Sequence, residues 1–252
     1  MPADRQTDDE LRSTVRLANR MLANEGILEG FGHVTARIPG ESRAFVSVAQ
    51  SPLLVEDDHI VTVPLEGDLP DDLQGEMYSE LPLHLAIYRH RPDVNCVVHH
   101  HAPEVMPFAC SDRDIKPMGK VGAIFADGVP RFDDYDLTRR GRLVVGREES
   151  DRMAEQLGEH TAQLLDGHGA NVVASTIEGA VYATVRLVEN AEYQWRAAAF
   201  AERDGFVDPI ESTASTIAAS AADRLWDHLR EKLLRSTGSQ QERSERRDGV
   251  PP

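Results

Sequence analysis

Several features that mark particular classes of protein are scarce or absent in this sequence. Its 252 residues contain two cysteines, Cys96 and Cys110, both in apolar surroundings, which predicts buried, reduced thiols rather than a disulfide framework. No run approaches 18 apolar residues, which excludes an ordinary membrane-spanning helix. The opening segment MPADRQTDDE is polar and acidic and lacks the basic-then-apolar pattern of a signal peptide, so we expect a cytoplasmic location.

Positive charge is also scarce. Asp and Glu number 43 against 27 Lys and Arg, and lysine occurs only at Lys116, Lys120 and Lys232. The formal net charge of −16 repels nucleic acid and anionic membranes, so we expect neither as a partner. A high-salt cytoplasm, which would screen the self-repulsion, and an ordinary acidic surface both agree with this balance.

The sequence does contain enough apolar material for a substantial core. Hydrophobic residues make up 40% of the chain, and its length suits one large domain. We expect a flexible arm over residues 1–8, one domain over 9–236, and a disordered tail over 237–252, which is nearly devoid of apolar residues. Strand patterns mixed with helix patterns predict a single layered α/β domain.

Helices and strands are expected to alternate along this domain. Helical spacing and stop signals predict helices over 9–25, 80–91, 148–165, 176–202 and 215–235. Short apolar or alternating runs predict a strand after Gly32 and further strands over 44–49, 59–65, 94–99 and 170–175. Ser79 is expected to cap the second helix, and Ser175 with Glu178 to form a capping box for the fourth.

Three consecutive histidines follow the apolar run VNCVV. Alternate side chains of a strand share a face, so His99 and His101 are expected to point one way and His100 the other. Two imidazoles at this spacing start about 6–7 Å apart and can converge on one ion at roughly 2.0–2.1 Å. The pair therefore predicts two metal ligands, whereas His100 is expected to pack in the interior or support the ligands.

A metal site needs a further ligand and, for catalysis, a base. His168 lies between two glycines in a turn, which lets the backbone approach a compact site. Glu80 opens the helix that leads into the histidine strand and shares a helical face with His84 and Tyr88. Two other interpretations stay open: His168 as a plain turn residue, and Glu80 as a complement to the helix dipole.

Other catalytic patterns do not fit. Glu104 follows His101 too closely for a cupin, and the chain is too helical for a jelly roll. No GxGxxG follows a strand, and the sequence has neither a P-loop nor a GxSxG elbow.

Four segments together resemble the class II aldolase/adducin family: GFGHVTARIP (30–39), SELPLHLAIYRHRPDVNCVVHHHAPEV (79–105), GVPRFD (128–133) and LLDGHGANVVASTIEGAVYATVRLVENAEYQ (164–194). The resemblance implies a three-layer α/β/α fold with a mixed, mostly antiparallel central sheet. It implies a divalent metal held by His99, His101 and His168, with Glu80 as the acid/base beside it. It further implies zinc as the usual metal, with manganese, cobalt, iron or magnesium as alternatives, and a homotetramer with active sites at subunit interfaces.

Departures from the sugar-phosphate aldolases of this family bear on the substrate. Those aldolases have an asparagine where this chain has His33, and small hydroxylated residues where it has Tyr78 and Ser79. The stretch ANRMLANEGILEGFGHVTAR and the RLWDHL run at 224–229 resemble instead a subgroup of decarboxylases acting on hydroxylated or ring-cleaved aromatic acids. In several of these a histidine lies in an HMAGF run, near the place of Lys120 here.

The preferred prediction is a metal-dependent carbon–carbon lyase that decarboxylates a hydroxy- or keto-carboxylic acid through a metal-stabilised enolate. A fuculose-phosphate-type sugar-phosphate aldolase is its close rival. A non-catalytic adducin-like interaction module and an iron-dependent oxygenase are further alternatives. The expected partner is a small carboxylic acid or a sugar phosphate, and its candidate contacts are Gly32, His33, Arg37 and Ser79, with Arg37 offering a bidentate fork to a carboxylate.

Overall fold

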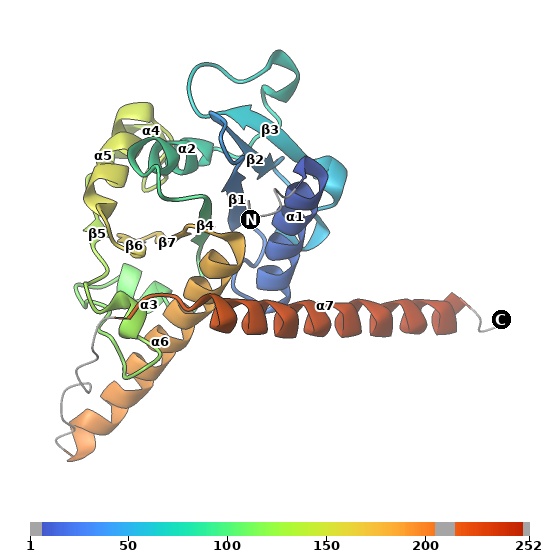
Figure 1. Ribbon diagram of the computed structural model, residues 1–252. Helices are drawn as coiled ribbons and strands as arrows, with labels where there is room; N and C mark the ends of the chain where they lie inside the picture. Colours follow the sequence, from blue (N-terminus) through green and yellow to red (C-terminus); the bar gives the residue numbers. More distant parts are fainter. Residues whose placement is uncertain (1–6, 205–214, 249–252) are drawn as a thin grey trace, which may run out of the picture.

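The computed structural model describes residues 7–204 and 215–248 (Figure 1). Its helices are α1 (Asp8–Asn24), α2 (Leu81–His90), α3 (Met106–Ala109), α4 (Leu137–Arg140), α5 (Arg147–Leu157), α6 (Ile177–Asp204) and α7 (Ala219–Asp248). Its strands are β1 (His33–Arg37), β2 (Arg43–Ser47), β3 (Ile60–Pro64), β4 (Cys96–His100), β5 (Arg131–Phe132), β6 (Ala162–Leu165) and β7 (Gly169–Ala174).

The strands form one seven-stranded sheet in the order β3-β2-β1-β4-β7-β6-β5. Neighbouring strands are antiparallel, except for the parallel pair of β5 and β6. The histidine strand β4 lies in the middle, with His99 opposite His33 of β1 and Asn171 of β7. This register brings polar residues of three strands to one place in an otherwise apolar sheet.

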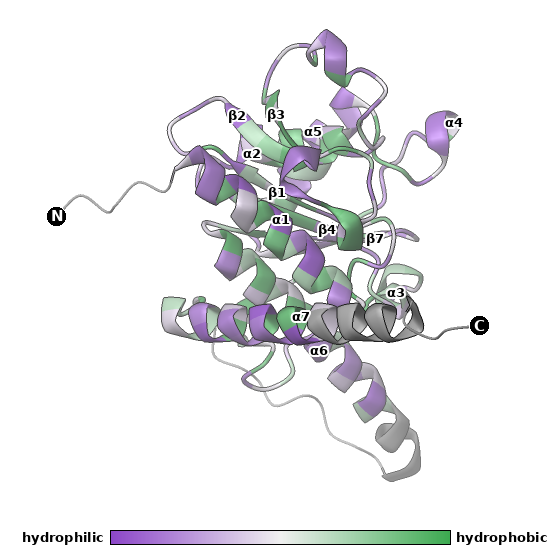
Figure 2. Cartoon of the chain, turned by 90° about the vertical axis from the view of Figure 1, so that its right-hand side faces the viewer, coloured by the Kyte–Doolittle hydropathy of each residue, from purple (hydrophilic) through white to green (hydrophobic). Residues whose placement is uncertain are grey.

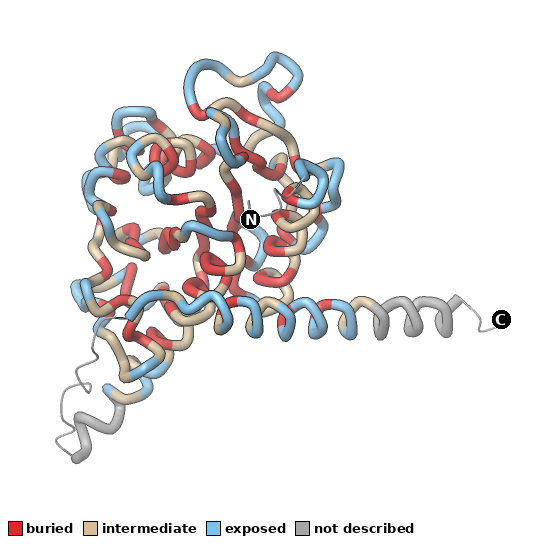
Figure 3. Tube along the Cα trace, in the orientation of Figure 1, coloured by how far each residue is buried: buried red, intermediate tan, exposed pale blue. Residues whose placement is uncertain are grey.

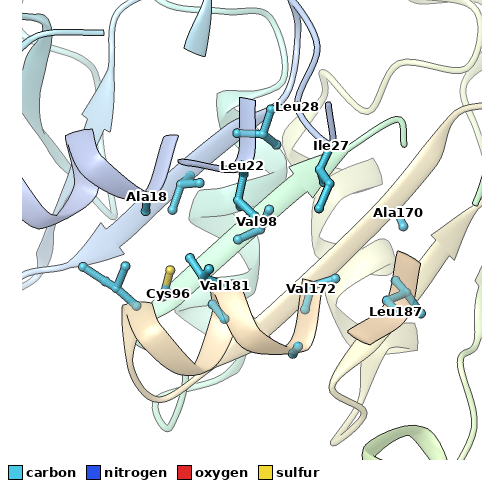
Figure 4. Close-up of a cluster of buried hydrophobic side chains, with 14 of the residues drawn as sticks. Ala18, Leu22, Ile27, Leu28, Cys96, Val98, Ala170, Val172, Val181 and Leu187 are labelled. Atoms are coloured by element: carbon cyan, nitrogen blue, oxygen red, sulfur yellow. The ribbon is translucent and has the colours of Figure 1, made fainter. Parts of the chain in front are cut away.

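Helices cover both faces of the sheet. On β4, Cys96 and Val98 belong to the buried cluster that includes residues of α1 and α6, and Figure 4 shows these side chains packed together. Val97, between them, belongs to the second cluster with α2 and α5. Buried residues accordingly concentrate along the strands and the helix faces turned to them (Figure 3). The three-layer α/β/α fold with a mixed, mostly antiparallel sheet is thereby confirmed.

Helix α1 shows how the sequence pattern builds one outer layer. Leu11, Val15, Ala18 and Leu22 repeat at helical spacing and are buried against the sheet. Figure 2 shows hydrophilic residues interleaved with them on the same helix. Thr7 caps the helix in a capping box, so α1 begins inside the arm expected over residues 1–8. Residues 1–6 of that arm lie outside the described residues.

The helix expected over 148–165 is wrong in its second half. Helix α5 ends at Leu157, and Gly158 follows with a φ of 54°, a left-handed conformation that favours glycine. The apolar segment after it forms the buried strand β6. Helical periodicity over a short segment could not distinguish a longer helix from a helix followed by a strand. The segment is a strand because it pairs between β5 and β7 in the sheet.

Two predicted helix caps are also wrong. Helix α6 is capped by Thr176, whose Oγ1 accepts a hydrogen bond from the Gly179 amide at 3.0 Å, in place of Ser175. At the start of α2 the cap position is held by Glu80 instead of Ser79, and its side chain makes no capping bond. The carboxylate of Glu80 is therefore available for another purpose.

Helix α7 continues to Asp248 and so extends into the segment 237–252, whose disorder in solution stays a prediction. The segment is rich in Glu, Gln and Arg, which propagate an existing helix well, and propagation avoids the unfavourable step of nucleation. Residues 249–252 lie outside the described residues. Of the helices that the structure describes, none is long and apolar enough to cross a membrane.

The two cysteines have different environments, in contrast to the expectation that both are buried. Cys96 is buried in β4, but Cys110 is exposed after the short helix α3. Both thiols are free. The apolar neighbours of Cys110 in the sequence belong to α3, which turns Phe108 and Ala109 inward and leaves Cys110 outside.

Candidate metal centre

Three imidazoles and one carboxylate converge at the end of β4. The Nε2 atom of His101 lies 3.0 Å from Nε2 of His99 and 3.0 Å from Nε2 of His168. Oε1 of Glu80 lies 3.2 Å from Nε2 of His168 and 3.7 Å from Nε2 of His99. The four donor atoms all lie within 4.8 Å of one another. The structure thus brings together the three predicted metal ligands and the predicted acid/base.

The turn between β6 and β7 carries His168 to this point. The amide of His168 donates to Leu165 O at 3.0 Å, and Gly167 has a φ of 66°. A Cβ at Gly169 would lie 2.4 Å from His100 O and 2.7 Å from the His101 ring. Only a residue without a side chain allows this approach, which explains the glycines around His168.

Asn171 orients the first ligand and was not among the predicted site residues. Its amide Nδ2 donates to the Met153 sulfur at 3.3 Å, which turns its Oδ1 toward Nδ1 of His99 at 2.9 Å. The Nδ1 atom of His99 therefore carries the hydrogen, and its Nε2 presents a lone pair to the cluster. An asparagine inside the apolar strand ANVVAS, opposite the histidine strand, was the available signal.

The protonation of the imidazoles suits a cation. Burial, reinforced by the neighbouring imidazoles, holds the pKa of His99 well below its usual range. Burial lowers the pKa of His168 to about 4 and also lowers that of His101. All three rings are therefore neutral near pH 7, which is the state in which imidazole binds a metal.

The spacing of the nitrogens fits a shared ion. Ligands at 2.0–2.1 Å from one ion lie about 3.0–3.3 Å apart at cis positions. A neutral His101 ring can donate at most one hydrogen from Nε2, yet this atom lies 3.0 Å from two other nitrogens. Because this nitrogen carries either one hydrogen or one lone pair, the two contacts cannot both be linear hydrogen bonds, whereas a cation between the three nitrogens would engage the lone pair of each. The donor set of the structure thus fits a divalent metal.

Glu80 has the properties of a proton carrier. Its side chain is buried, and burial raises the pKa of its carboxyl to about 7. Its Oε1 has no hydrogen-bond partner among the described residues. A carboxyl with a pKa near the working pH can both release and take up a proton.

A cavity of about 850 Å³ opens onto this cluster. The chemically distinctive residues of its wall are His33, Tyr78, Ser79, Glu80, His101 and His168. The His33 ring stacks on Tyr78 with centroids 3.6 Å apart and an interplanar angle of 8°. Phe31, which also lines the cavity, is 78% exposed. The cavity can therefore hold a small molecule between an aromatic wall and the histidine cluster.

The four predicted substrate contacts separate into different roles. His33 and Ser79 line the cavity, whereas Gly32 is absent from its wall. A Cβ on Gly32 would lie 2.9 Å from His99 O, so this glycine lets β1 approach the strand of the ligands.

Arg37 is not brought to the site. Its guanidinium donates to the backbone carbonyls of Tyr88, Val94 and Arg91. It lies at the end of β1 opposite to His33, so the predicted contact with a substrate carboxylate is wrong. The sequence places Arg37 near the glycine loop, but the extended strand carries it roughly 13 Å away from His33.

The remaining histidines of the segment support the structure. His100 points to the face opposite to His99, is fully buried, and its Nδ1 accepts from the Ala102 amide at 3.2 Å. His84 lies beneath the site, with its Nδ1 3.0 Å from Thr35 Oγ1, which in turn lies 2.8 Å from Tyr88 Oη. The alternation expected for the strand therefore holds in the structure.

Comparison with known proteins identifies the family. Residues 13–195 match the family described as Class II Aldolase and Adducin N-terminal domain, and the chain belongs to this family. It is 34% identical over 186 residues to a 3,4-dihydroxyphthalate decarboxylase of Arthrobacter keyseri, covering 68% of this chain and 71% of that protein.

Solved structures agree on the fold. An aldolase II superfamily protein from Pseudomonas syringae superposes with a TM-score of 0.76 at 21% identity, covering 93% of this chain and 96% of that one. The L-fuculose-1-phosphate aldolase of Thermus thermophilus gives a TM-score of 0.64 at 22% identity, covering 76% and 97%. The predicted family, its decarboxylase subgroup and an enzyme of the lyase class are confirmed.

Proposed function

We propose that this protein is a metal-dependent carbon–carbon lyase that decarboxylates a hydroxylated aromatic or keto-carboxylic acid. The observation that carries the proposal is the convergence of three imidazole nitrogens and the Glu80 carboxylate within 4.8 Å, at the wall of a cavity of about 850 Å³. The similarity to a dihydroxyphthalate decarboxylase supports the choice of reaction and substrate class.

His99, His101 and His168 would hold the metal, with zinc as the first candidate. Three neutral ligands leave the charge of a divalent ion undiminished. When bound, such a cation supplies positive charge that stabilises the electron pair left on the substrate when carbon dioxide departs. Asn171 fixes the ring of His99 for this purpose through the Nδ1 hydrogen bond of 2.9 Å.

Glu80 would complete the reaction by moving a proton. Loss of carbon dioxide leaves both electrons of the broken carbon–carbon bond on the substrate carbon, which must then accept a proton. The carboxyl of Glu80, whose burial raises its pKa to about 7 in the metal-free protein, can deliver this proton and regain one from solvent. Its position at the start of α2, without any capping bond, leaves it available for this transfer.

The stacked pair of His33 and Tyr78 favours a planar acid over a sugar phosphate. Both side chains line the cavity, and together they form a flat aromatic wall. Burial raises the pKa of the Tyr78 hydroxyl, so this residue stays neutral and does not repel an anion. A sugar-phosphate aldolase is the alternative function. A non-catalytic module is disfavoured because all three histidines and Glu80 are present.

A turnover screen tests the proposal. The metal-free protein and the zinc-loaded protein are incubated with 3,4-dihydroxyphthalate and with L-fuculose 1-phosphate, while carbon dioxide, aldehyde and oxygen uptake are followed separately. We expect carbon dioxide release from the aromatic acid only when metal is present. Aldehyde formation alone would favour the aldolase, oxygen uptake an oxygenase, and failure to bind metal an adducin-like module.

Assembly and location remain part of the proposal. We expect a homotetramer with active sites at subunit interfaces and a cytoplasmic enzyme. Phe31, 78% exposed at the wall of the cavity, is consistent with a neighbouring subunit completing that wall. Light scattering of the purified protein measures the assembly directly.

A further inference from the structure

The cavity wall has no fixed positive charge among the described residues. Its described lining contains histidines, a tyrosine, Glu80, uncharged polar residues and apolar side chains, but neither Lys nor Arg. A substrate with two carboxylates would bring one to the metal centre and leave the other without a cation. Because the chain carries a formal charge of −16, a second carboxylate would also meet a repulsive field.

Arg140 supplies a cation at the edge of this cavity. Its Nη1 donates to Oγ of Ser79 at 2.8 Å, and Ser79 lines the cavity directly before Glu80. Leu143, three residues later, is part of the same wall. The segment from Arg140 to Leu143 therefore runs along the cavity rather than away from it.

Arg140 also differs from the arginines on either side of it. Arg139 pairs with Asp136 at 3.0 Å, and Arg142 pairs with Asp166. In the part of the chain that the structure describes, Arg140 has no carboxylate within ion-pair distance, and its recorded partner is the neutral hydroxyl of Ser79. Four further donors of its guanidinium are thus free for an anion.

The neighbouring contacts hold this segment in place. Arg142 donates to the backbone oxygen of Asp166 at 3.0 Å, in the turn that carries His168. A Cβ on Gly167 would lie 2.7 Å from Cδ of Arg142, which shows how closely the two segments pack. The segment from Arg140 to Leu143 therefore has two contacts beside the site. Arg142 binds the turn of His168, and Arg140 binds Ser79 just before α2.

We propose that Arg140, together with the hydroxyl of Ser79, binds a second carboxylate of the substrate and thereby selects dicarboxylic over monocarboxylic acids. The inference rests on the proposed function, because it assigns the second anionic group of the same substrate. The guanidinium offers two parallel N–H donors to a carboxylate, a geometry that lysine cannot reproduce. The hydroxyl of Ser79 holds Arg140 toward the cavity when the site is empty of substrate.

Binding of simple aromatic acids by calorimetry tests the assignment without turnover. Phthalate has two adjacent carboxylates and benzoate has one, and neither carries the ring hydroxyls of the proposed substrate. We expect the zinc-loaded wild-type protein to bind phthalate more tightly than benzoate. Arg140→Ala should weaken phthalate binding by about 10- to 100-fold, the range of a charge-assisted hydrogen bond, and change benzoate binding by less than about twofold.

Matched variants separate a specific contact from general charge. Arg139→Ala removes the same charge one residue away, from an arginine already paired with Asp136, and should leave phthalate binding unchanged. Arg140→Lys should recover part of the affinity. Equal phthalate affinity of Arg140→Ala and wild type, or an equal loss in Arg139→Ala, would overturn the inference. Because Arg140 is exposed, an unchanged melting temperature and metal content are expected for its variants.

Kinetics distinguish failure of this inference from failure of the proposed function. With 3,4-dihydroxyphthalate we expect Arg140→Ala to raise KM by about 10- to 100-fold and to leave kcat nearly unchanged, because Arg140 lies away from the reacting carbon. Carbon dioxide release with an unchanged KM in this variant would refute the role of Arg140 and leave the lyase intact. A phthalate preference that depends on Arg140, without carbon dioxide release from any acid, would refute the reaction and leave the binding site intact.

Discussion

Individual histidines in the run at the end of β4 have opposite roles, although they are adjacent in sequence. His99 and His101 present Nε2 to the cluster that His168 completes, whereas His100 is turned to the other face of the sheet and accepts from the Ala102 amide. We expect His168→Ala to lower zinc affinity by at least about 100-fold and to abolish turnover, because one of three nitrogen donors is lost. Metal analysis after dialysis measures this directly.

His100→Ala is the matched control for that substitution. It removes a fully buried ring on the face of the sheet opposite to His99 and should cost about 2–4 kcal/mol of unfolding free energy while the metal is retained. If His100→Ala alone lost the metal while the protein stayed folded, then His100 would be a ligand and the assignment of strand faces would be wrong.

The protonation of Glu80 makes the unfolding free energy of the metal-free protein depend on pH. Burial raises its pKa to about 7 from 4.5, so the folded metal-free protein binds this proton more tightly than the unfolded chain does. The stabilisation from Glu80 is therefore complete below pH 4.5 and is lost as the pH rises to 7. Relative to Glu80→Gln, the metal-free wild type should lose up to about 3 kcal/mol of unfolding free energy over this window.

Denaturant titrations of both metal-free proteins at several pH values measure this difference. The variant is the necessary reference, because the histidines with lowered pKa values change stability in the opposite direction and are common to both proteins. Glu80→Gln should also retain zinc and lose turnover. Parallel pH profiles for the two proteins would contradict a buried, protonatable Glu80.

The role of a residue could be predicted from the sequence where local chain geometry determines the position of its side chain. His99, His101 and His168 were predictable because a strand alternates its side chains and flanking glycines indicate a close approach. Asn171 and Arg37 depend on which strand lies beside which and where each strand ends. Asn171 meets His99 through sheet register, and Arg37 is carried to three carbonyls at the far end of β1. Neither fact is contained in local spacing.

At the scale of elements, the turn between β6 and β7 determines whether the site can form. Gly169→Ala places a Cβ 2.4 Å from His100 O, so the turn must shift and carry His168 with it. We expect a loss of about 1–3 kcal/mol in unfolding free energy together with weaker zinc binding. Thermal melts with and without zinc separate the two effects, since the shift in melting temperature produced by zinc should shrink.

Gly30→Ala provides the comparison for that prediction. Gly30 also lies in a glycine-containing loop at the cavity, but a Cβ there meets nothing within 4 Å and its φ is not positive. This substitution should change the unfolding free energy by less than about 0.5 kcal/mol. If the two alanine variants behaved alike, close backbone approach at Gly169 would not be the reason for its glycine.

Helices and strands were predictable where one local signal dominated. The prediction failed where packing against neighbouring elements determined the secondary structure. The amphipathic pattern and the stop at Gly26 located α1, whose described end at Asn24 lies close to that glycine. The sequence predicts the end of a helix where strand β6 lies, because a four-residue segment with three apolar residues suits either structure until the neighbouring strands of the sheet are known. Gly158, with its φ of 54°, was the signal that could have marked the boundary.

At the scale of the whole molecule, the excess of acidic residues opposes the compact state. Local pairs such as Arg89 with Asp151 and Arg16 with Asp57 neutralise part of the charge, but a formal −16 remains. Raising salt from 0.1 to 1 M shortens the Debye length from about 10 to about 3 Å, which screens long-range repulsion and also weakens exposed pairs. Exposed pairs contribute only about 0–1 kcal/mol each, so relief of the repulsion should dominate.

The zinc-loaded protein should therefore melt at a higher temperature in 1 M than in 0.1 M potassium chloride, by at least several degrees. An uncharged osmolyte at equal osmolality separates screening from preferential exclusion, because it leaves the charge repulsion unchanged. A lower or unchanged melting temperature in salt would show that the acidic residues are already neutralised by their neighbours. That result would favour an ordinary acidic surface. A rise in melting temperature with salt that the osmolyte does not reproduce would instead favour a surface adapted to high salt as the explanation of so few lysines.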